Sequence, residues 1–249
     1  MSTTSEILYA VSNGVARLTL NAPERRNALS VEMALLLTEA ARTAENDSQV
    51  GALVLSGGPH FCAGAVRGVL AAAGADPVED TSYRNLGAVY EAFTVVGAIG
   101  IPTVAAVRGA AVGAGLNLAL ATDLRIVSRT ARLLPGFAQL GIHPGGGHFT
   151  LLNRAGGREA AAAMGLFGEE VDGERAVALG LAWAAYDDVE VEERALALAT
   201  RVAADPDLAR RTVASFRRET VPGGVSLDVA VEIERAPQMW SLRRRHGKD

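Results

Sequence analysis

Two glycine-punctuated loops, each at the exit of a short apolar run, most constrain what this chain can fold into. The first loop, Phe61–Ala65, follows Ala52–Leu55, and the second, Val112–Asn117, follows Val104–Val107. Short apolar runs bounded by glycine indicate buried strands. Glycine also serves ordinary turns, so one such loop alone is weak evidence of function. Two bare backbone amides that converge on one point, however, form an oxyanion hole, which stabilises a carbonyl oxygen as it gains negative charge.

Length, charge and cysteine content narrow the class of protein. The chain has 249 residues, enough for one large domain or a domain with a helical appendage. A net charge of -4 argues against general nucleic-acid binding, which needs a basic surplus. Cys62 is the only cysteine, which excludes an internal disulfide and favours a packing role. Met1–Glu6 does not resemble a signal peptide and no apolar run predicts a membrane span, so we expect a cytoplasmic protein.

Periodicity in the N-terminal part predicts strands and helices in alternation. Residues 7–11 and 15–20 alternate as a hairpin around Asn13 and Gly14. Ser30 is a typical N-cap for a helix whose apolar residues share one face, and a buried strand over residues 50–56 follows. The small and polar residues of 68–82 predict a mobile or partly disordered lid, after which residues 83–96 have helical spacing.

The second half of the chain continues this order and then becomes helical. A helix over 114–121 and a strand over 124–127 complete a repeated strand, strand, helix order, which predicts an α/β spiral of stacked ββα units. Helices are expected over 192–204, 206–219 and 227–240, separated at Pro206 and Pro222. We therefore divide the chain into a spiral core with the binding site, 1–190, and a C-terminal helical region, 191–249.

Six segments, in the same order, resemble signatures of the enoyl-CoA hydratase/isomerase (crotonase) superfamily. The similarity covers most of the chain and includes both glycine loops. The segments are Leu20–Ser30, Gly57–Ala65, Ile101–Asp123, Leu140–Gly147, Gly168–Glu170 and Ala176–Leu181.

This resemblance implies a crotonase-type spiral that binds acyl-CoA thioesters in fatty acid metabolism, as a lyase or an isomerase. Coenzyme A would then be part of the substrate, with no tightly bound cofactor. The histidines lack ligand spacing, so no metal is expected. The C-terminal helices of relatives mediate trimer assembly, which implies a homotrimer or a hexamer built as a dimer of trimers.

Carried over by position, the resemblance assigns the thioester oxygen to the N–H groups of Ala65 and Ala114. Ala114 also opens a helix, whose positive end attracts an enolate. Small side chains at Ala63 and Ala65 leave room for the ligand. Arg25 and Arg26, beside the first signature, are candidate partners for the phosphates of coenzyme A, although charges in a turn are often simply solvated.

The chain departs from the family at both positions that carry a catalytic glutamate. Asn117 occupies the first position and Phe137 the second, and neither side chain takes a proton from water at neutral pH. No Asp or Glu lies between Arg125 and Asn153, so a shifted alignment does not restore the second acid. His143 and His148 flank a turn in this stretch, and a histidine there is a candidate base, although packing or capping is its more ordinary role.

Two functions remain open at this point. One is an enzyme with enolate-based chemistry or slow hydration supported by Asn117. The other is a non-catalytic acyl-CoA carrier or sensor that keeps the ligand site without the acids. A peptidase of the related spiral fold lacks support, because Ser, His and Asp are missing from the helix starts where a nucleophile would stand.

Overall fold

The computed structural model describes residues 5–76, 78–220 and 223–246. Its larger sheet has the strand order β1-β2-β3-β4-β6-β9, in which β1 and β2 are antiparallel and all later neighbours are parallel. A smaller sheet has the order β5-β7-β8. The strands are β1 (Ile7–Ser12), β2 (Val15–Leu20), β3 (Ala52–Ser56), β4 (Thr103–Val107), β5 (Ala110–Val112), β6 (Leu124–Ser128), β7 (Arg132–Leu134), β8 (Val171–Asp172) and β9 (Ala184–Tyr186).

Helices fill the connections between the strands. The units β1-β2-α1, β4-β5-α4 and β6-β7-α5 each place two strands before a helix, as the sequence predicted. None of the helices in the described ranges is long and apolar enough to cross a bilayer. The helices are η1 (Pro23–Arg25), α1 (Val31–Asn46), α2 (Arg67–Ala75), α3 (Asp80–Ala98), α4 (Ala114–Ala121), α5 (Phe137–Leu140), α6 (His148–Gly165), α7 (Gly173–Ala178), α8 (Val191–Ala203), α9 (Pro206–Glu219) and α10 (Leu227–His246).

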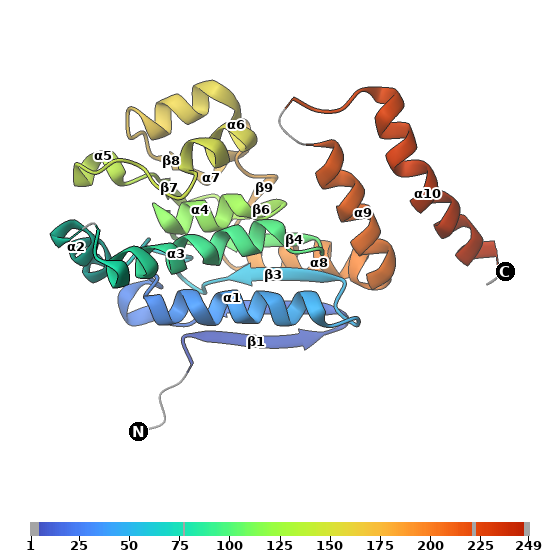
Figure 1. Ribbon diagram of the computed structural model, residues 1–249, viewed down its shortest axis with the longest axis horizontal. Helices are drawn as coiled ribbons and strands as arrows, with labels where there is room; N and C mark the ends of the chain where they lie inside the picture. The colour runs from blue at the N-terminus through green and yellow to red at the C-terminus, as the bar shows by residue number, and fades with distance from the viewer. Residues whose placement is uncertain (1–4, 77, 221–222, 247–249) are drawn as a thin grey trace.

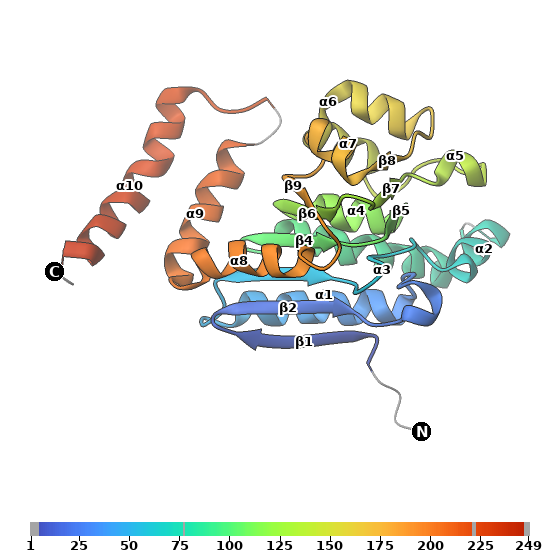
Figure 2. The ribbon, with the colours of Figure 1, turned by 180° about the vertical axis from the view of Figure 1, so that it is seen from behind.

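The central strands β3 and β4 are buried along their whole length, because helices cover both faces of the sheet. Side chains alternate between two cores. Leu55 and Val107 pack in the larger core, which α1, α3 and α4 close. Val54 and Val104 face the opposite way and pack under α8. Figure 1 shows α1 and α3 over one face, and Figure 2 shows α8 over the other.

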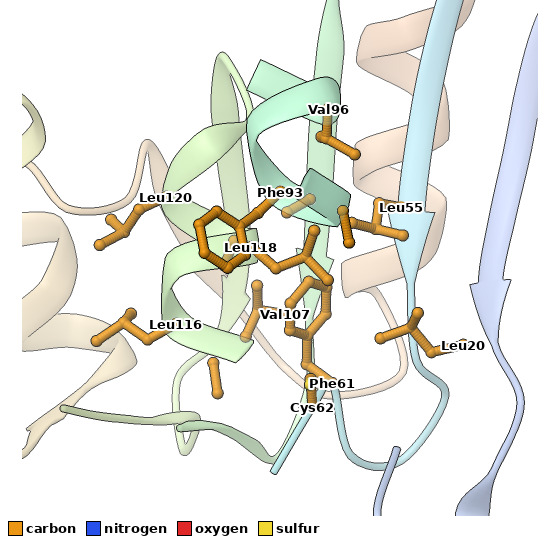
Figure 3. Packing of buried hydrophobic residues seen from close by; sticks show 14 of the residues in the cluster. Leu20, Leu55, Phe61, Cys62, Phe93, Val96, Val107, Leu116, Leu118 and Leu120 are labelled. Atoms are coloured by element: carbon orange, nitrogen blue, oxygen red, sulfur yellow. The ribbon is translucent and has the colours of Figure 1, made fainter. Parts of the chain in front are cut away.

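The first glycine loop is anchored in the larger core. Phe61 and Cys62 are fully buried there, and Figure 3 shows Phe61 beside Val107 of β4. Burial raises the pKa of the Cys62 thiol to about 12, so this side chain stays protonated at neutral pH. Cys62 therefore acts as a small packing residue, as the sequence predicted.

The C-terminal region begins with a helix that belongs to the core packing. The buried residues of α8 include Ala195, Ala199 and Ala203, whose spacing of four puts small side chains on one face against the sheet. The helix α9 is attached by Arg217, which donates to the carbonyl of Ile99 and pairs with Asp123 at 3.3 Å. The boundary between the spiral core, 1–190, and the helical region, 191–249, stays a prediction. The helix α8 belongs to the second segment but packs on the sheet of the first.

The last helix packs on α9 and lies on its far side from the core (Figure 1). Its Trp240 ring is contacted by the guanidinium groups of Arg211 and Arg244, at 4.0 and 4.5 Å from the ring centre. Apolar side chains elsewhere on this helix remain exposed, Leu227 and Met239 among them. The tail is therefore joined to the body through α9.

Several local predictions are confirmed. Asn13 and Gly14 both have positive φ, as a two-residue hairpin turn requires, and the Ser30 side chain accepts from the N–H of Met33. Residues 68–82 differ from the expected lid, because α2 and the start of α3 are formed there. Val69 packs on the core and Leu70 faces a cavity, which gives α2 an apolar face. Pro77 lies outside the described residues.

Candidate active site

The two glycine loops run side by side in register. An isolated parallel bridge pairs Cys62 with Ala111, through hydrogen bonds from the Cys62 N–H to the Ala110 carbonyl and from the Val112 N–H to the Cys62 carbonyl, both 3.0 Å. Ala65 and Ala114 each lie three residues beyond this bridge. Both residues line the same cavity. The backbone thus brings together the two positions that the sequence assigned to an oxyanion hole.

Glycine is required where the loops touch. Gly64 has φ +98°, and a Cβ there would lie 2.9 Å from the Val112 carbonyl oxygen. At Gly115 a Cβ would lie 2.3 Å from the carbonyl oxygen of Cys62. The N-terminus of α4 therefore rests directly on the backbone of the first loop.

Among the residues that the structure describes, no hydrogen bond uses the N–H of Ala65 or the N–H of Ala114. The bridge between Leu29 and Ala65 uses the carbonyl of Gly64 and the N–H of Val66, so the Ala65 N–H stands outside it. Ala114 is the first residue of α4, where an N–H has no acceptor within the helix. Two backbone donors at one cavity, one of them at the positive end of a helix, suit an oxygen that carries negative charge.

The cavity is small and almost entirely apolar. Its volume is about 80 Å³, several times the space that one water-sized group needs. Among the described residues that line it, Tyr90 and Asn117 have the only polar side chains, and none has a carboxylate. The lining residues are Ala63, Gly64, Ala65, Leu70, Leu86, Val89, Tyr90, Val112, Gly113, Ala114, Asn117, Pro135, Gly136, Phe137, Leu140, Ile142 and Gly145.

Asn117 is held on both sides of its side-chain amide. It lies one turn into α4 and is 1 % exposed. Its Nδ2 donates to the carbonyl oxygen of Gly145 at 3.1 Å, and its Oδ1 lies 2.7 Å from Nδ1 of His148. A carboxylate at this position would face the Gly145 carbonyl. The residue is therefore placed as a fixed amide and not as a proton acceptor.

His148 opens α6 and is buried behind Asn117. It is 1 % exposed, and its ring lies edge-on to Phe137 with 4.9 Å between ring centres. Burial lowers the pKa of His148 to about 4, so the ring is neutral at pH 7. Its Nε2 is buried and has no hydrogen-bond partner within the described residues. A buried unpaired acceptor of this kind costs about 1–3 kcal/mol.

The buried histidine predicts a loss of stability in mild acid. The unfolded chain takes up a proton at this ring near pH 6.5, whereas the folded chain resists it until about pH 4. The neutral His148 ring therefore contributes its full stability above pH 6.5. As the pH falls from 6.5 to 4, the free energy of unfolding decreases by up to about 3 kcal/mol. Urea titrations between pH 4.5 and 7.5 should show this slope in the wild type and in His143→Asn, but not in His148→Asn. An unchanged slope in His148→Asn would contradict the assignment.

The other candidate residues are placed as follows. Phe137 opens α5 and lines the cavity, and its ring approaches the backbone at Gly113. His143 is exposed, its Nδ1 lies 2.7 Å from the Pro144 carbonyl oxygen, and it is not among the cavity residues. The structure brings Phe137 to the site together with Asn117, and it brings His148, not His143, into contact with them.

The two arginines differ in their surroundings. Arg25 pairs with Glu6 and Glu24, and its Nε donates to the Ala28 carbonyl. Arg26 has φ +51° and an exposed side chain, and its carbonyl accepts from the Ala63 N–H at 3.0 Å. Arg26 thus links the first signature to the first loop through its backbone. Contact of either guanidinium with coenzyme A stays a prediction.

Tyr90 is a site residue that the sequence did not reveal. It projects from α3 into the cavity wall, and its hydroxyl lies against Gly145, where an added Cβ would be 2.3 Å from the oxygen. Burial raises the pKa of its phenol. The only sequence signal at Tyr90 is the helical spacing of apolar residues in α3. Such spacing does not distinguish a core tyrosine from a site tyrosine.

The structure is an α/β fold in which Ala65 and Ala114 line one largely apolar cavity. A family model described as enoyl-CoA hydratase/isomerase matches residues 10–229. The chain is 42 % identical over 242 residues to a probable enoyl-CoA hydratase of Mycobacterium tuberculosis, covering 95 % of this chain and 92 % of that one. It is 33 % identical over 256 residues to 1,2-epoxyphenylacetyl-CoA isomerase of Escherichia coli, covering 95 % and 90 %.

Among solved structures, a Thermobifida fusca protein in complex with CoA aligns with a TM-score of 0.82 at 27 % identity, covering 98 % of this chain and 95 % of that one. The chain belongs to the enoyl-CoA hydratase/isomerase family, and its fold is the crotonase-type spiral.

Proposed function

We propose that this protein binds acyl-CoA thioesters with the thioester oxygen between the N–H groups of Ala65 and Ala114, and that it stabilises the enolate formed from them. The observation that carries the proposal is the register of the two loops, which puts both unused amides three residues beyond one backbone bridge. Preorganised backbone donors act most strongly on charge that develops during the reaction. The CoA complex of the Thermobifida fusca relative supports the ligand class.

The proposed chemistry differs from standard hydration. Addition of water across a conjugated double bond needs a base and an acid, whereas Asn117 and Phe137 offer neither. We therefore propose that the two amides stabilise the enolate charge on the thioester oxygen while the α-proton passes to a water molecule admitted to the cavity, because the described lining residues include no carboxylate. A non-catalytic acyl-CoA carrier or sensor is the second candidate, and the uncharged lining of the cavity favours it.

The oxyanion role is tested by comparing two ligands that differ at one oxygen. Butanoyl-CoA has the thioester carbonyl, and S-butyl-CoA has a CH₂ group in its place. Calorimetry with the full chain should show about tenfold tighter binding of the thioester, since two hydrogen bonds are lost in the thioether. Equal affinities would overturn the proposal.

Turnover separates the enzyme from the carrier. Crotonyl-CoA and longer 2-enoyl-CoA substrates can be followed by loss of the conjugated absorbance and by product analysis. Turnover supports the enzyme, and thioester binding without any conversion supports the carrier. Arg26→Ala, which changes an exposed side chain outside the cavity, tests the contact with the phosphates by its effect on CoA affinity.

We also propose that residues 191–249 assemble the chain into a homotrimer or a dimer of trimers in the cytoplasm. Exposed apolar side chains on the two last helices support this assembly, because exposed apolar clusters mark interfaces. Sedimentation of the full chain should give three or six copies, and a monomer would contradict the proposal. These side chains are Leu208 and Phe216 on α9, and Leu227, Val229, Val231, Met239 and Leu242 on α10.

A further inference from the structure

The orientation of the Asn117 amide is fixed by chemistry. The backbone carbonyl of Gly145 only accepts hydrogen bonds, so the atom of Asn117 that faces it at 3.1 Å is the amino nitrogen Nδ2. The carbonyl oxygen Oδ1 must then face His148. Because Oδ1 also only accepts, the histidine Nδ1 at 2.7 Å carries the proton and donates it. The Gly145 contact excludes the flipped amide, and the tautomer of His148 follows from it.

The amino end of Asn117 is the end on the cavity side. Gly145, which the amino group contacts, lines the cavity, whereas His148, which the carbonyl end contacts, is 1 % exposed and is not a lining residue. An Asn amino group has two protons, and the Gly145 carbonyl takes one of them. The second N–H therefore remains available to a ligand, in a cavity whose walls are otherwise apolar except for Tyr90.

We infer that Asn117 is a specificity-determining hydrogen-bond donor, that His148 is the positioning residue that orients it, and that the site selects acyl-CoA thioesters with an acceptor oxygen on the β-carbon of the acyl group. This inference rests on the proposed binding of the thioester oxygen by Ala65 and Ala114. To that proposal it adds the acyl group that Asn117 recognises, which is a 3-oxo chain or another chain with an oxygen on the β-carbon.

The position of the donor along the acyl chain follows from α4. Asn117 is three residues after Ala114, and three residues of an α-helix rise about 4.5 Å along its axis. An oxygen on the β-carbon is separated from the thioester oxygen by three carbon atoms, a distance of the same order. One oxygen can thus lie at the start of α4 while the other meets Asn117.

The buried amide also disfavours acyl groups without such an oxygen. An unsubstituted chain would leave the second N–H unpaired against apolar walls, and leaving a buried polar group unpaired is the strongest basis for rejecting a ligand. His148 enforces this choice because it holds Oδ1 and keeps the amide from turning its acceptor toward the cavity.

The experiment compares butanoyl-CoA with 3-oxobutanoyl-CoA by calorimetry on the full chain. Neither ligand can be hydrated or dehydrated across a double bond, so turnover of that kind does not disturb the measurement. We expect the 3-oxo ligand to bind about tenfold more tightly to the wild type. In Asn117→Leu, an apolar replacement of similar size, the ratio should fall to about one.

A matched control isolates the donor. Asn153→Leu makes the same exchange at an exposed position of α6 that does not line the cavity, and it should keep the ratio near ten. A preference that persists in Asn117→Leu would mean that the oxyanion amides alone favour the more acidic ligand, and this result would overturn the inference. A preference lost in Tyr90→Phe and kept in Asn117→Leu would assign the donor to Tyr90 and would overturn it as well.

The positioning role of His148 is tested by a pair of substitutions. In His148→Asn the amide nitrogen occupies the place of Nδ1 and can still donate to Asn117, whereas His148→Leu offers no donor. The ratio of the two affinities should survive in His148→Asn and collapse in His148→Leu. A merely structural role would weaken both ligands together and leave the ratio unchanged, which would contradict the positioning role.

The wild-type comparison alone keeps the inference falsifiable if a variant fails to fold. Equal binding of both ligands overturns the selection of β-oxygenated chains and leaves the proposed function standing. Binding of neither ligand overturns the proposed function itself, and the inference falls with it.

Discussion

Replacement of Gly115 by alanine is expected to separate the two glycine loops and to abolish the preference for a thioester over its thioether analogue. The new Cβ would lie 2.3 Å from the carbonyl oxygen of Cys62 and 2.7 Å from its Cβ. Neither atom belongs to a flexible side chain, and Cys62 is fully buried and bridged to Ala111. Overpacking of this kind costs about 1–3 kcal/mol or more, which exceeds the gain of about 1 kcal/mol from alanine in a helix.

The substitution should also be visible in ligand binding. A displacement of α4 away from the first loop moves the Ala114 amide relative to the Ala65 amide, so the preference of about tenfold for the thioester should fall to about one. Calorimetry with butanoyl-CoA and S-butyl-CoA measures the preference, and urea titration measures the stability.

Gly87→Ala is the matched control for this substitution. Gly87 lies in α3, is exposed, and would present its Cβ to no heavy atom within 4 Å. This variant should be as stable as the wild type or slightly more stable, and it should bind the thioester unchanged. A Gly115→Ala protein that keeps the wild-type preference would show that the close contact of the loops does not set the oxyanion geometry.

The sequence was sufficient for the parts of the site that depend on neighbouring residues. The glycines at 64 and 115 are required by a positive φ and by a backbone contact, and both requirements leave a local mark in the sequence. The start of α4 at Ala114 and the N-cap at Ser30 were predicted for the same reason. The family resemblance then supplied the pairing of the two loops, which no local pattern contains.

The sequence was insufficient where distant segments meet. His148 and Asn117 are 31 residues apart and lie on α6 and α4, so only the packing of these helices makes one the hydrogen-bond partner of the other. Tyr90 comes from α3. His143 and His148 looked equivalent in the sequence, and burial alone distinguishes them. The helix α2 likewise contacts the core through Val69, and local composition does not reveal this contact.

Asn27→Ala is expected to give the largest loss of stability, because this side chain ties the first signature to the first loop. Asn27 is 2 % exposed. Its Oδ1 accepts from the Ala22 N–H at 2.8 Å, and its Nδ2 donates to the carbonyls of Gly57 and His60, both at 2.7 Å. Alanine would leave three backbone groups without this partner, and it would keep a strained φ of +55° without an asparagine's tolerance for it.

We expect Asn27→Ala to lower the free energy of unfolding by about 4 kcal/mol, since each buried group left unpaired costs about 1–3 kcal/mol. Asn13→Ala is the matched control: Asn13 has a similar φ of +50° but is exposed, so it reports the backbone strain alone, about 1 kcal/mol. Urea denaturation of both variants measures the difference. Equal losses would mean that the three hydrogen bonds contribute little. A larger loss in Asn27→Ala, together with weaker thioester binding, would show that this asparagine holds the Ala65 amide in place through the loop it anchors.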